Sequence, residues 1–186
     1  MTQKTLKELY VDELRDLYDS EQQLIKSLPK MVKAANSDEL SSGFEEHLEQ
    51  TKGHVNRLEE ICEQLDITPK GKKCAAMEGL IEEGKELMEE DAGTSILDAG
   101  LIAAAQKVEH YEIASYGSVR TWAEQLELEE VVQLLQETLD EEKETDEKLT
   151  QLAVSAVNEE ADAGENDDDD EETSAIDGEK RGGGKR

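Results

Sequence analysis

The stretch AAAQKVEHYEIASYG, residues 103–117, carries the pattern on which the fold depends. Its apolar side chains recur every three or four residues, the spacing that marks one face of an α-helix. Glu109 and Glu112 fall on that same face, between Ala105 and Tyr116. Burying an unpaired carboxylate costs several kcal/mol, so this face is expected to meet other polar groups inside the fold.

Three further helical stretches carry ionisable or amide side chains at the centre of their apolar face. These are Glu21 in the first stretch, His47, Gln50 and His54 in the second, and Glu142 with Asp146 in the last. Antiparallel helices of similar length bring their centres to one level. We therefore expect all these groups to converge on one buried layer.

Apolar periodicity predicts four long helices and one short helix. The long helices are expected over residues 5–35, 38–65, 95–125 and 129–157, and the short one over residues 74–90. Pro29 falls inside the first helix and is expected to kink it. Short breaks join the first long helix to the second and the third to the fourth, so each of these two pairs is expected to be an antiparallel hairpin. The sequence thus predicts an all-α, ferritin-like antiparallel four-helix bundle with a long crossover containing an extra short helix.

The domain is predicted to cover residues 1–157, and residues 158–186 are predicted to form a disordered acidic tail. This tail contains an acidic run at residues 167–172 and three glycines at residues 182–184. It has almost no apolar side chains with which to build a core.

A net charge of −28 limits the partners of the chain. Nucleic acids and anionic membranes are excluded as expected partners, because binding to both relies on Lys and Arg. The acidity has two explanations: halophilic adaptation to high salt, where screening relieves self-repulsion, or attraction of cations. The first is favoured for most of the charge, since the carboxylates far outnumber what one site can use.

A cytoplasmic location is expected. Cys62 and Cys74 form no disulfide framework, and the chain begins with a polar stretch rather than a signal peptide. No apolar run approaches the roughly 20 residues needed to span a bilayer.

The donor types of the predicted layer suit iron, with manganese as the alternative. Candidate ligands are Glu21, His47, Gln50, His54, Glu109, Glu112, Glu142 and Asp146. Because 48 of the 186 residues are Asp or Glu, any single match could arise by chance. The coincidence of four helices at one level favours a metal site. The alternative for His47 and His54 is a hydrogen-bonded core or rim histidine.

Four segments resemble the YciE/YciF family of ferritin-like proteins. They are residues 12–18 (DELRDLY), 73–84 (KCAAMEGLIEEG), 103–117 and 139–146 (LDEEKETD), and the resemblance covers about residues 4–155. It implies a four-helix bundle with a di-iron-type site. In that site Glu21 would be the first-helix carboxylate, Glu109 and Glu112 the third-helix pair, and Glu142 the fourth-helix carboxylate.

The second and fourth long helices depart from the usual ferritin-like pattern, which has Glu-x-x-His on two helices. Gln50 stands where a carboxylate is expected, and Asp146 is a candidate substitute for the missing histidine after Glu142. A neutral Gln removes one charge and one bridging ligand. A single-metal site is therefore the alternative to a di-iron site.

Two functions are compatible with these residues and with the resemblance. The first is a metal-binding, iron-dependent oxidoreductase or ferroxidase that uses oxygen or peroxide in the stress response. The second is a non-enzymatic helical-bundle stress or interaction protein with a degenerate or single-metal site. The resemblance also implies a homodimer.

Overall fold

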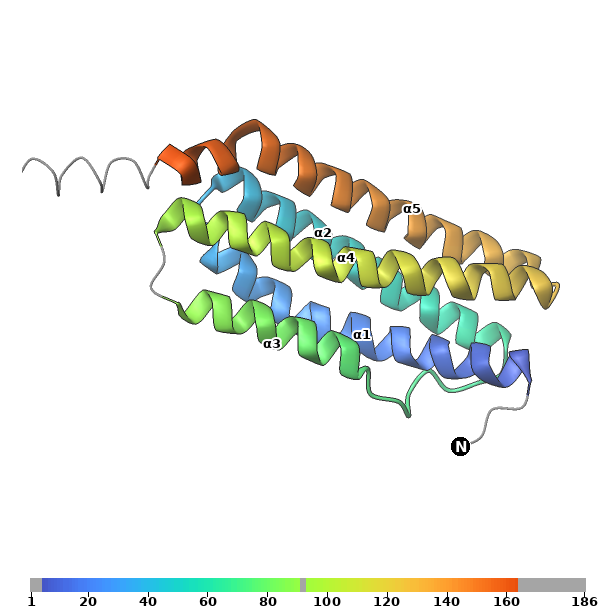
Figure 1. Cartoon of the computed structure of the whole chain (residues 1–186). Helices are drawn as coiled ribbons and strands as arrows, with labels where there is room; N and C mark the ends of the chain where they lie inside the picture. The colour runs from blue at the N-terminus through green and yellow to red at the C-terminus, as the bar shows by residue number, and fades with distance from the viewer. Residues whose placement is uncertain (1–4, 91–92, 164–186) are drawn as a thin grey trace, which may run out of the picture.

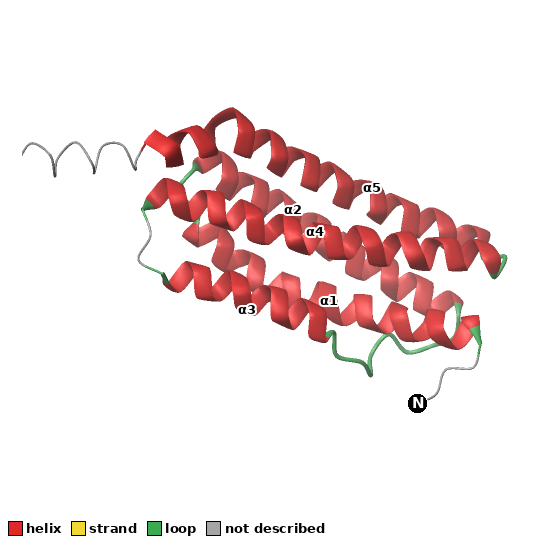
Figure 2. Ribbon diagram, in the orientation of Figure 1, coloured by secondary structure: helices red, strands yellow, loops and turns green. Residues whose placement is uncertain are grey.

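The computed structural model describes residues 5–90 and 93–163, and each element within those ranges is helical (Figures 1 and 2). The elements are α1 (Leu6–Ala34), α2 (Asp38–Gln64), α3 (Ala75–Glu89), α4 (Thr94–Gln125), α5 (Glu129–Leu152) and the π-helix η1 (Ala153–Val157). The predicted all-α class and the five helices are confirmed. Pro29 lies within α1 without ending it.

The four long helices form two hairpins that lie side by side (Figure 1). Helices α1 and α2 make one hairpin, and α4 and α5 make the other. Helix α3 belongs to the crossover and packs along α1 and α4. The predicted ferritin-like bundle with an extra crossover helix is confirmed. No helix in the described ranges is both long enough and apolar enough to cross a membrane.

The helical part of the chain continues beyond residue 157. The last turns of the hairpin adopt π-helical geometry at Ala153–Val157, and residues 158–163 are again helical. Val157 is only 2% exposed and packs into the core, which explains why the helix does not end there. The predicted domain boundary therefore falls inside a helix. The remainder of the predicted tail, residues 164–186, lies outside the described residues.

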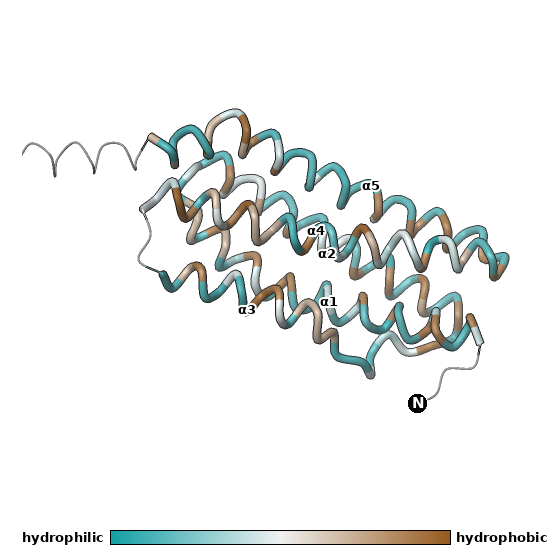
Figure 3. Tube along the Cα trace, in the orientation of Figure 1, coloured by the Kyte–Doolittle hydropathy of each residue, from teal (hydrophilic) through white to brown (hydrophobic). Residues whose placement is uncertain are grey.

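Two apolar clusters fill the interior, one on each side of the helix centres. The first contains Tyr10, Leu14, Leu17, Val55, Leu58, Ile61, Tyr116, Val119, Val131 and Leu135. The second contains Leu24, Leu28, Leu40, Phe44, Met77, Leu101, Ile102, Ala105, Val108 and Leu149. Hydrophobic and hydrophilic residues alternate along each helix, as expected of amphipathic helices around a shared core (Figure 3). Between the two clusters every long helix contributes polar groups.

Asp98 ties the two hairpins together at one end of the bundle. Its carboxylate is 4% exposed and accepts hydrogen bonds from the backbone N–H groups of Asn36 and Ser37, both at 2.8 Å. Ser37 is also the N-cap residue of α2, where its hydroxyl accepts from the N–H of Leu40 at 3.3 Å. One carboxylate on α4 therefore fixes the turn between α1 and α2.

An Asp98→Ala variant is expected to lose about 2–4 kcal/mol of unfolding free energy, because it leaves two backbone N–H groups without their charged acceptor. The measurement is urea unfolding followed by circular dichroism. The control is Asp140→Ala, which removes an exposed carboxylate of α5 and should cost less than about 0.5 kcal/mol. Equal losses of unfolding free energy in the two variants would show that Asp98 does not stabilise the turn between α1 and α2.

Candidate metal centre

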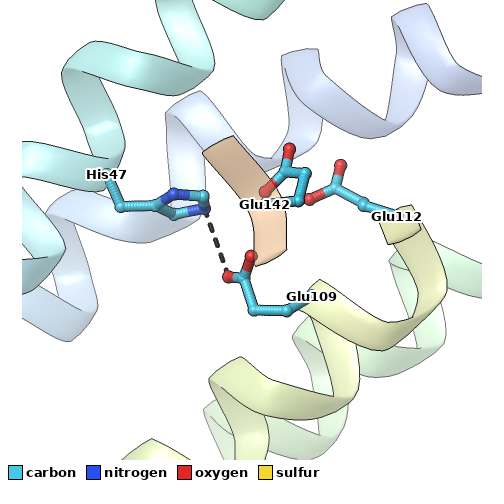
Figure 4. Close-up of side chains that lie close together, drawn as sticks. All are labelled: His47, Glu109, Glu112 and Glu142. Atoms are coloured by element: carbon cyan, nitrogen blue, oxygen red, sulfur yellow. Dashed lines mark ion pairs between the residues drawn. The ribbon is translucent and has the colours of Figure 1, made fainter. Parts of the chain in front are cut away.

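The four long helices bring six of the eight predicted ligand residues to one buried layer. These are Glu21 from α1, His47 and His54 from α2, Glu109 and Glu112 from α4, and Glu142 from α5. Each is at most 3% exposed. Figure 4 shows His47 facing Glu109, with Glu112 and Glu142 completing the same group.

The six residues form two groups that share one carboxylate. The first group is His47, Glu109, Glu112 and Glu142, and the second is Glu21, His54 and Glu142. Within each group, one ligand atom per residue lies within 4.8 Å of the others. Glu142 belongs to both groups, and neither of its oxygens has a hydrogen-bond partner.

Gln50 lies outside this cluster, at the rim of the bundle. It is half-buried, and its Oε1 accepts a hydrogen bond from the Thr145 hydroxyl at 3.4 Å. The inward positions of α2 are instead His47, Thr51 and His54. The sequence placed Gln50 with these groups because it lies between the two histidines, but the rotation of α2 turns it toward α5.

Asp146 also lies outside the cluster. Its carboxylate accepts a hydrogen bond from Gln106 Nε2 at 3.0 Å and lies 3.4 Å from Nε2 of the exposed His110. Thr145, one residue earlier, takes the inward position one turn after Glu142. A one-residue step on an α-helix is a rotation of about 100°, which is enough to send Asp146 to the outer side of α4.

Most of the buried polar atoms without a hydrogen-bond partner belong to this cluster. Within the described residues there are nine such side-chain atoms, and seven of them lie in these six residues: Glu21 Oε2, His47 Nε2, His54 Nδ1, Glu109 Oε2, Glu112 Oε2 and both oxygens of Glu142. Buried polar atoms are normally paired, so this concentration calls for an explanation. Seven oxygen and nitrogen atoms that can bind a metal thus lie in one layer without a hydrogen-bond partner, as expected of a site for cations.

The ring of His54 is held from outside the cluster. Its Nε2 lies 2.9 Å from Glu141 Oε2, while its Nδ1 lies 3.0 Å from Glu142 Oε1 and 3.4 Å from Glu21 Oε1. The Nδ1 distances are those of ion pairs, but the atom makes no hydrogen bond of acceptable geometry. Metal-bound histidines commonly donate their second ring N–H to a carboxylate in this way. His54 is thus oriented to offer Nδ1 to a cation.

Glu141 and Arg57 are functional candidates that the sequence did not reveal. Two Arg57 nitrogens, Nη1 and Nη2, donate to the two oxygens of Glu141 at 2.7 and 2.8 Å. Both side chains lie on the flank of their helix, so neither belongs to an apolar stripe. The available signal was their spacing: Glu141 precedes Glu142, and Arg57 follows His54 by one turn.

His47 has a similar but looser arrangement. Its Nε2 lies 3.3 Å from Glu109 Oε1, and its Nδ1 lies 3.4 Å from the Thr145 hydroxyl. Nε2 makes no hydrogen bond of acceptable geometry, as with His54 Nδ1. One nitrogen of each imidazole therefore faces the carboxylates, and the other contacts a polar group of α5.

Two hydroxyl groups complete the layer. Tyr116 donates a hydrogen bond to Glu21 Oε1 at 2.5 Å, and Ser20 donates to Glu112 Oε1 at 3.3 Å. Burial, together with the charge of Glu21, raises the pKa of Tyr116 well above its ordinary value. The phenol therefore stays neutral and serves as a donor to Glu21.

Burial and mutual repulsion shift the charges of this layer. Burial and the charge of Glu142 raise the pKa of Glu109, and burial and Glu21 raise the pKa of Glu112. Burial would also raise the pKa of Glu142, but the close contact with His54 and its charge hold that pKa below its ordinary value.

His54 is the main positive counterpart in the layer. Burial disfavours its imidazolium form, but Glu21 and Glu141 outweigh that effect and raise the pKa of His54. In return, the hydrogen bond from His54, helped by Arg57 and opposed by partial burial, lowers the pKa of Glu141 to about 2. Without metal, the layer is thus stabilised by protons on His54 and on the carboxyls with raised pKa values.

The donor set matches that of ferritin-like di-metal proteins, with a different distribution over the helices. Those proteins use four carboxylates and two imidazoles, with Glu-x-x-His on two helices. Here α2 supplies both imidazoles, and α4 supplies two carboxylates, Glu109 and Glu112. Four carboxylates balance the charge of two divalent cations. The residues present therefore fit a carboxylate-bridged metal pair.

Comparisons with known proteins agree with this fold. A family model described as "Domain of unknown function (DUF892)" matches residues 5–162. Protein YciF of Escherichia coli (strain K12) is 48% identical over 162 residues, which cover 87% of this chain and 98% of that protein.

Solved structures show the same similarity. The crystal structure of the E. coli stress protein YciF aligns with a TM-score of 0.81 and 48% identity, covering 84% of this chain and 99% of that chain. YcfI of Rhodopseudomonas palustris, for which a structural role is suggested, gives a TM-score of 0.77 and 43% identity over 79% and 94% of the two chains. A Xanthomonas campestris pv. campestris protein is 21% identical with a TM-score of 0.65, covering 82% and 94%, and shares the fold.

A Glu112→Gln variant is expected to stabilise the metal-free protein by about 1–2 kcal/mol at neutral pH, because it removes a buried carboxyl whose ionised form is disfavoured by burial and by Glu21. The folded-state pKa of Glu112 is raised, so the native chain holds a proton that the unfolded chain releases. Native stability therefore falls as pH rises from the unfolded pKa through the folded one, and the advantage of the variant should grow with pH.

The measurement is urea unfolding of wild type and E112Q at a series of pH values, with the exposed Glu45→Gln as control. A variant that is less stable than wild type throughout, or whose advantage shrinks as pH rises, would contradict the assignment of Glu112 as a strained buried carboxyl.

A Glu141→Gln variant is expected to weaken Mn(II) binding about 10–100-fold, because it removes the carboxylate that orients His54. Isothermal titration calorimetry gives the dissociation constant. The matched control is Glu137→Gln, one turn earlier on α5, where an exposed carboxylate lies 3.3 Å from Nε of the same Arg57. Equal weakening in both variants would show that surface charge, rather than His54 orientation, is responsible.

Proposed function

This chain belongs to the DUF892 family, and we propose that it is an iron-dependent oxidoreductase of the ferroxidase type. Its substrates would be Fe(II) and either dioxygen or hydrogen peroxide. The observation that carries the proposal is the pair of ligand groups that share Glu142, in a layer where seven buried donor atoms lack partners. The description of E. coli YciF as a stress protein supports a role in oxidative or metal stress.

The chemistry that iron supplies at this site is one-electron transfer from each of two ions. Two Fe(II) become two Fe(III), while two protons and one dioxygen become hydrogen peroxide, or two protons and one hydrogen peroxide become two waters. Carboxylate-rich sites favour this chemistry because they stabilise the higher charge of Fe(III) and leave exchangeable positions.

The side chains of this chain have separate tasks in the proposed reaction. Glu142 belongs to both ligand groups and would help to hold a cation in each. Glu109 and Glu112 have raised pKa values, so they release any bound protons when cations replace them. His54 and His47 offer one nitrogen each and are oriented from α5.

The apolar clusters on both sides of the layer limit the access of water. Leu17 and Leu24 of α1 flank Glu21 and are 0% and 2% exposed. Low local polarity strengthens the attraction between cations and carboxylates. Manganese is the alternative metal, because the same oxygen-rich donor set accepts it.

A non-enzymatic role is the second candidate, and the contacts of His54 favour it. The ring lies within 3.4 Å of Glu21, Glu141 and Glu142, so a protonated His54 offsets part of the charge without any metal. The structural role suggested for YcfI of Rhodopseudomonas palustris agrees with this reading. The layer would then serve the specificity of helix packing.

The deciding experiment measures iron binding and oxidation together. Wild type is expected to bind two Fe(II) per chain without oxygen and, once oxidant is added, to oxidise Fe(II) faster than buffer. Glu142→Gln should lower that rate at least about tenfold, because both ligand groups lose a member. The control is Glu144→Gln, which changes a carboxylate that is 62% exposed.

Retention of one ion or none, with oxidation no faster than in buffer, would overturn the ferroxidase proposal and favour the non-enzymatic role. Equal activity of E142Q and E144Q would place the oxidation outside this cluster.

A further inference from the structure

A cavity of about 530 Å³ lies between α2 and α5 and reaches the metal cluster from one side. Cavities that hold small organic ligands commonly measure roughly 300–1,000 Å³. The lining includes His47 and Glu109, two members of the first ligand group, together with Gln50 and Thr145. Its inner end therefore adjoins side chains that can bind a cation.

Much of the wall of this cavity is apolar. Leu28 of α1, Phe44 of α2, Val108 of α4 and Leu149 of α5 all contribute, and each is at most 8% exposed. Water gains few hydrogen bonds against such a wall, so apolar surface of a ligand is favoured there. The body of the occupant is expected to be hydrocarbon.

Gln50 lines the cavity with an amide that can make further hydrogen bonds. Its Oε1 accepts from the Thr145 hydroxyl, whereas its Nε2 makes no hydrogen bond within the described part of the chain. An amide nitrogen can donate two hydrogen bonds. The Gln50 amide thus offers a neutral donor to a ligand oxygen.

The charges along the cavity disfavour an anion. Glu39 and Glu46 line it together with one basic residue, Lys148, whose Nζ already lies 3.1 Å from Glu46 and 3.1 Å from Glu144. A cationic ligand would lose its hydration, and two of the carboxylates that line the cavity already have a basic neighbour: Glu46 has Lys148, and Glu109 Oε1 lies 3.3 Å from His47. A neutral ligand avoids both costs.

The contact that joins α2 to α5 at the outer part of the cavity is weak. The pair formed by Glu46 and Lys148 joins α2 to α5 there, and its side chains are 58% and 46% exposed, so the contact is weak. Ser155, which also lines the cavity, belongs to the π-helix at the end of α5. Single π-turns occur frequently at functional sites, where they widen a helix locally.

We propose that this cavity binds a small neutral organic molecule with an apolar body and one terminal oxygen, such as an alcohol or an aldehyde. The oxygen accepts a hydrogen bond from Gln50 Nε2 beside His47 and Glu109, and the hydrocarbon chain extends along Phe44 and Leu149. Neither the binding nor its test requires a metal, so its failure and the failure of the ferroxidase proposal are distinguishable.

The test compares three probes that share one hydrocarbon chain: 1-octanol, octanoate and octylammonium. Each is titrated into the full, metal-free chain, and binding is followed by ligand-observed NMR. Octanol is expected to bind saturably and at least about tenfold more tightly than either ion, a difference equal to one 1.4 kcal/mol step in affinity. No saturable octanol binding, or an ion that binds as tightly as octanol, would overturn the proposal.

Two variants locate the bound molecule. Gln50→Ala is expected to weaken octanol binding about fivefold, the usual size of one neutral hydrogen bond, while the exposed neighbour Glu49→Gln leaves it unchanged. Ala105→Leu extends a side chain that lines the cavity and should remove saturable binding. Unchanged binding in Q50A, or retained binding in a folded A105L, would show that octanol lies elsewhere and would overturn the assignment.

Discussion

The burial of four carboxylates in one layer is the constraint on which the rest of this bundle depends. Glu21, Glu109, Glu112 and Glu142 are each at most 1% exposed. Carboxylates in an apolar core need cations or protons, because desolvation disfavours the charged form. The imidazoles, and the protons that the raised pKa values of Glu109 and Glu112 favour, offset part of the buried charge. Several carboxylate oxygens still lack a hydrogen-bond partner. A bound metal pair would satisfy those oxygens and remove the repulsion among them.

The energy to hold that layer comes from its surroundings. Apolar clusters pack on both sides of it, and Asp98 fixes the turn between α1 and α2 from the opposite hairpin. Arg57 and Glu141 hold His54 from the flank. Proteins commonly accept such local destabilisation where a site must stay ready for a ligand. The cavity beside His47 also adjoins this carboxylate layer, which the surrounding apolar clusters stabilise.

Much of the fold was predictable because its signals are local. Apolar periodicity located all five helices to within a few residues, and the long crossover followed from the break between the hairpins. The same periodicity correctly brought Glu109 and Glu112 inward. It was less accurate at Gln50 and Asp146, where a rotation of one residue moves a side chain from the core to the rim. Thr145 holds the inward position one turn after Glu142, and Asp146 does not share it.

The sequence by itself determined that each long helix carries polar groups near the centre of its inner face, since a 3.6-residue repeat is a property of one chain segment. Only the tertiary structure decided that Glu142 belongs to two ligand groups. It also decided that Glu141 holds His54 and that a cavity opens beside Gln50. The physical reason is that these features depend on how far apart the helices pack and how each is rotated. Side chains distant in the sequence set both quantities together.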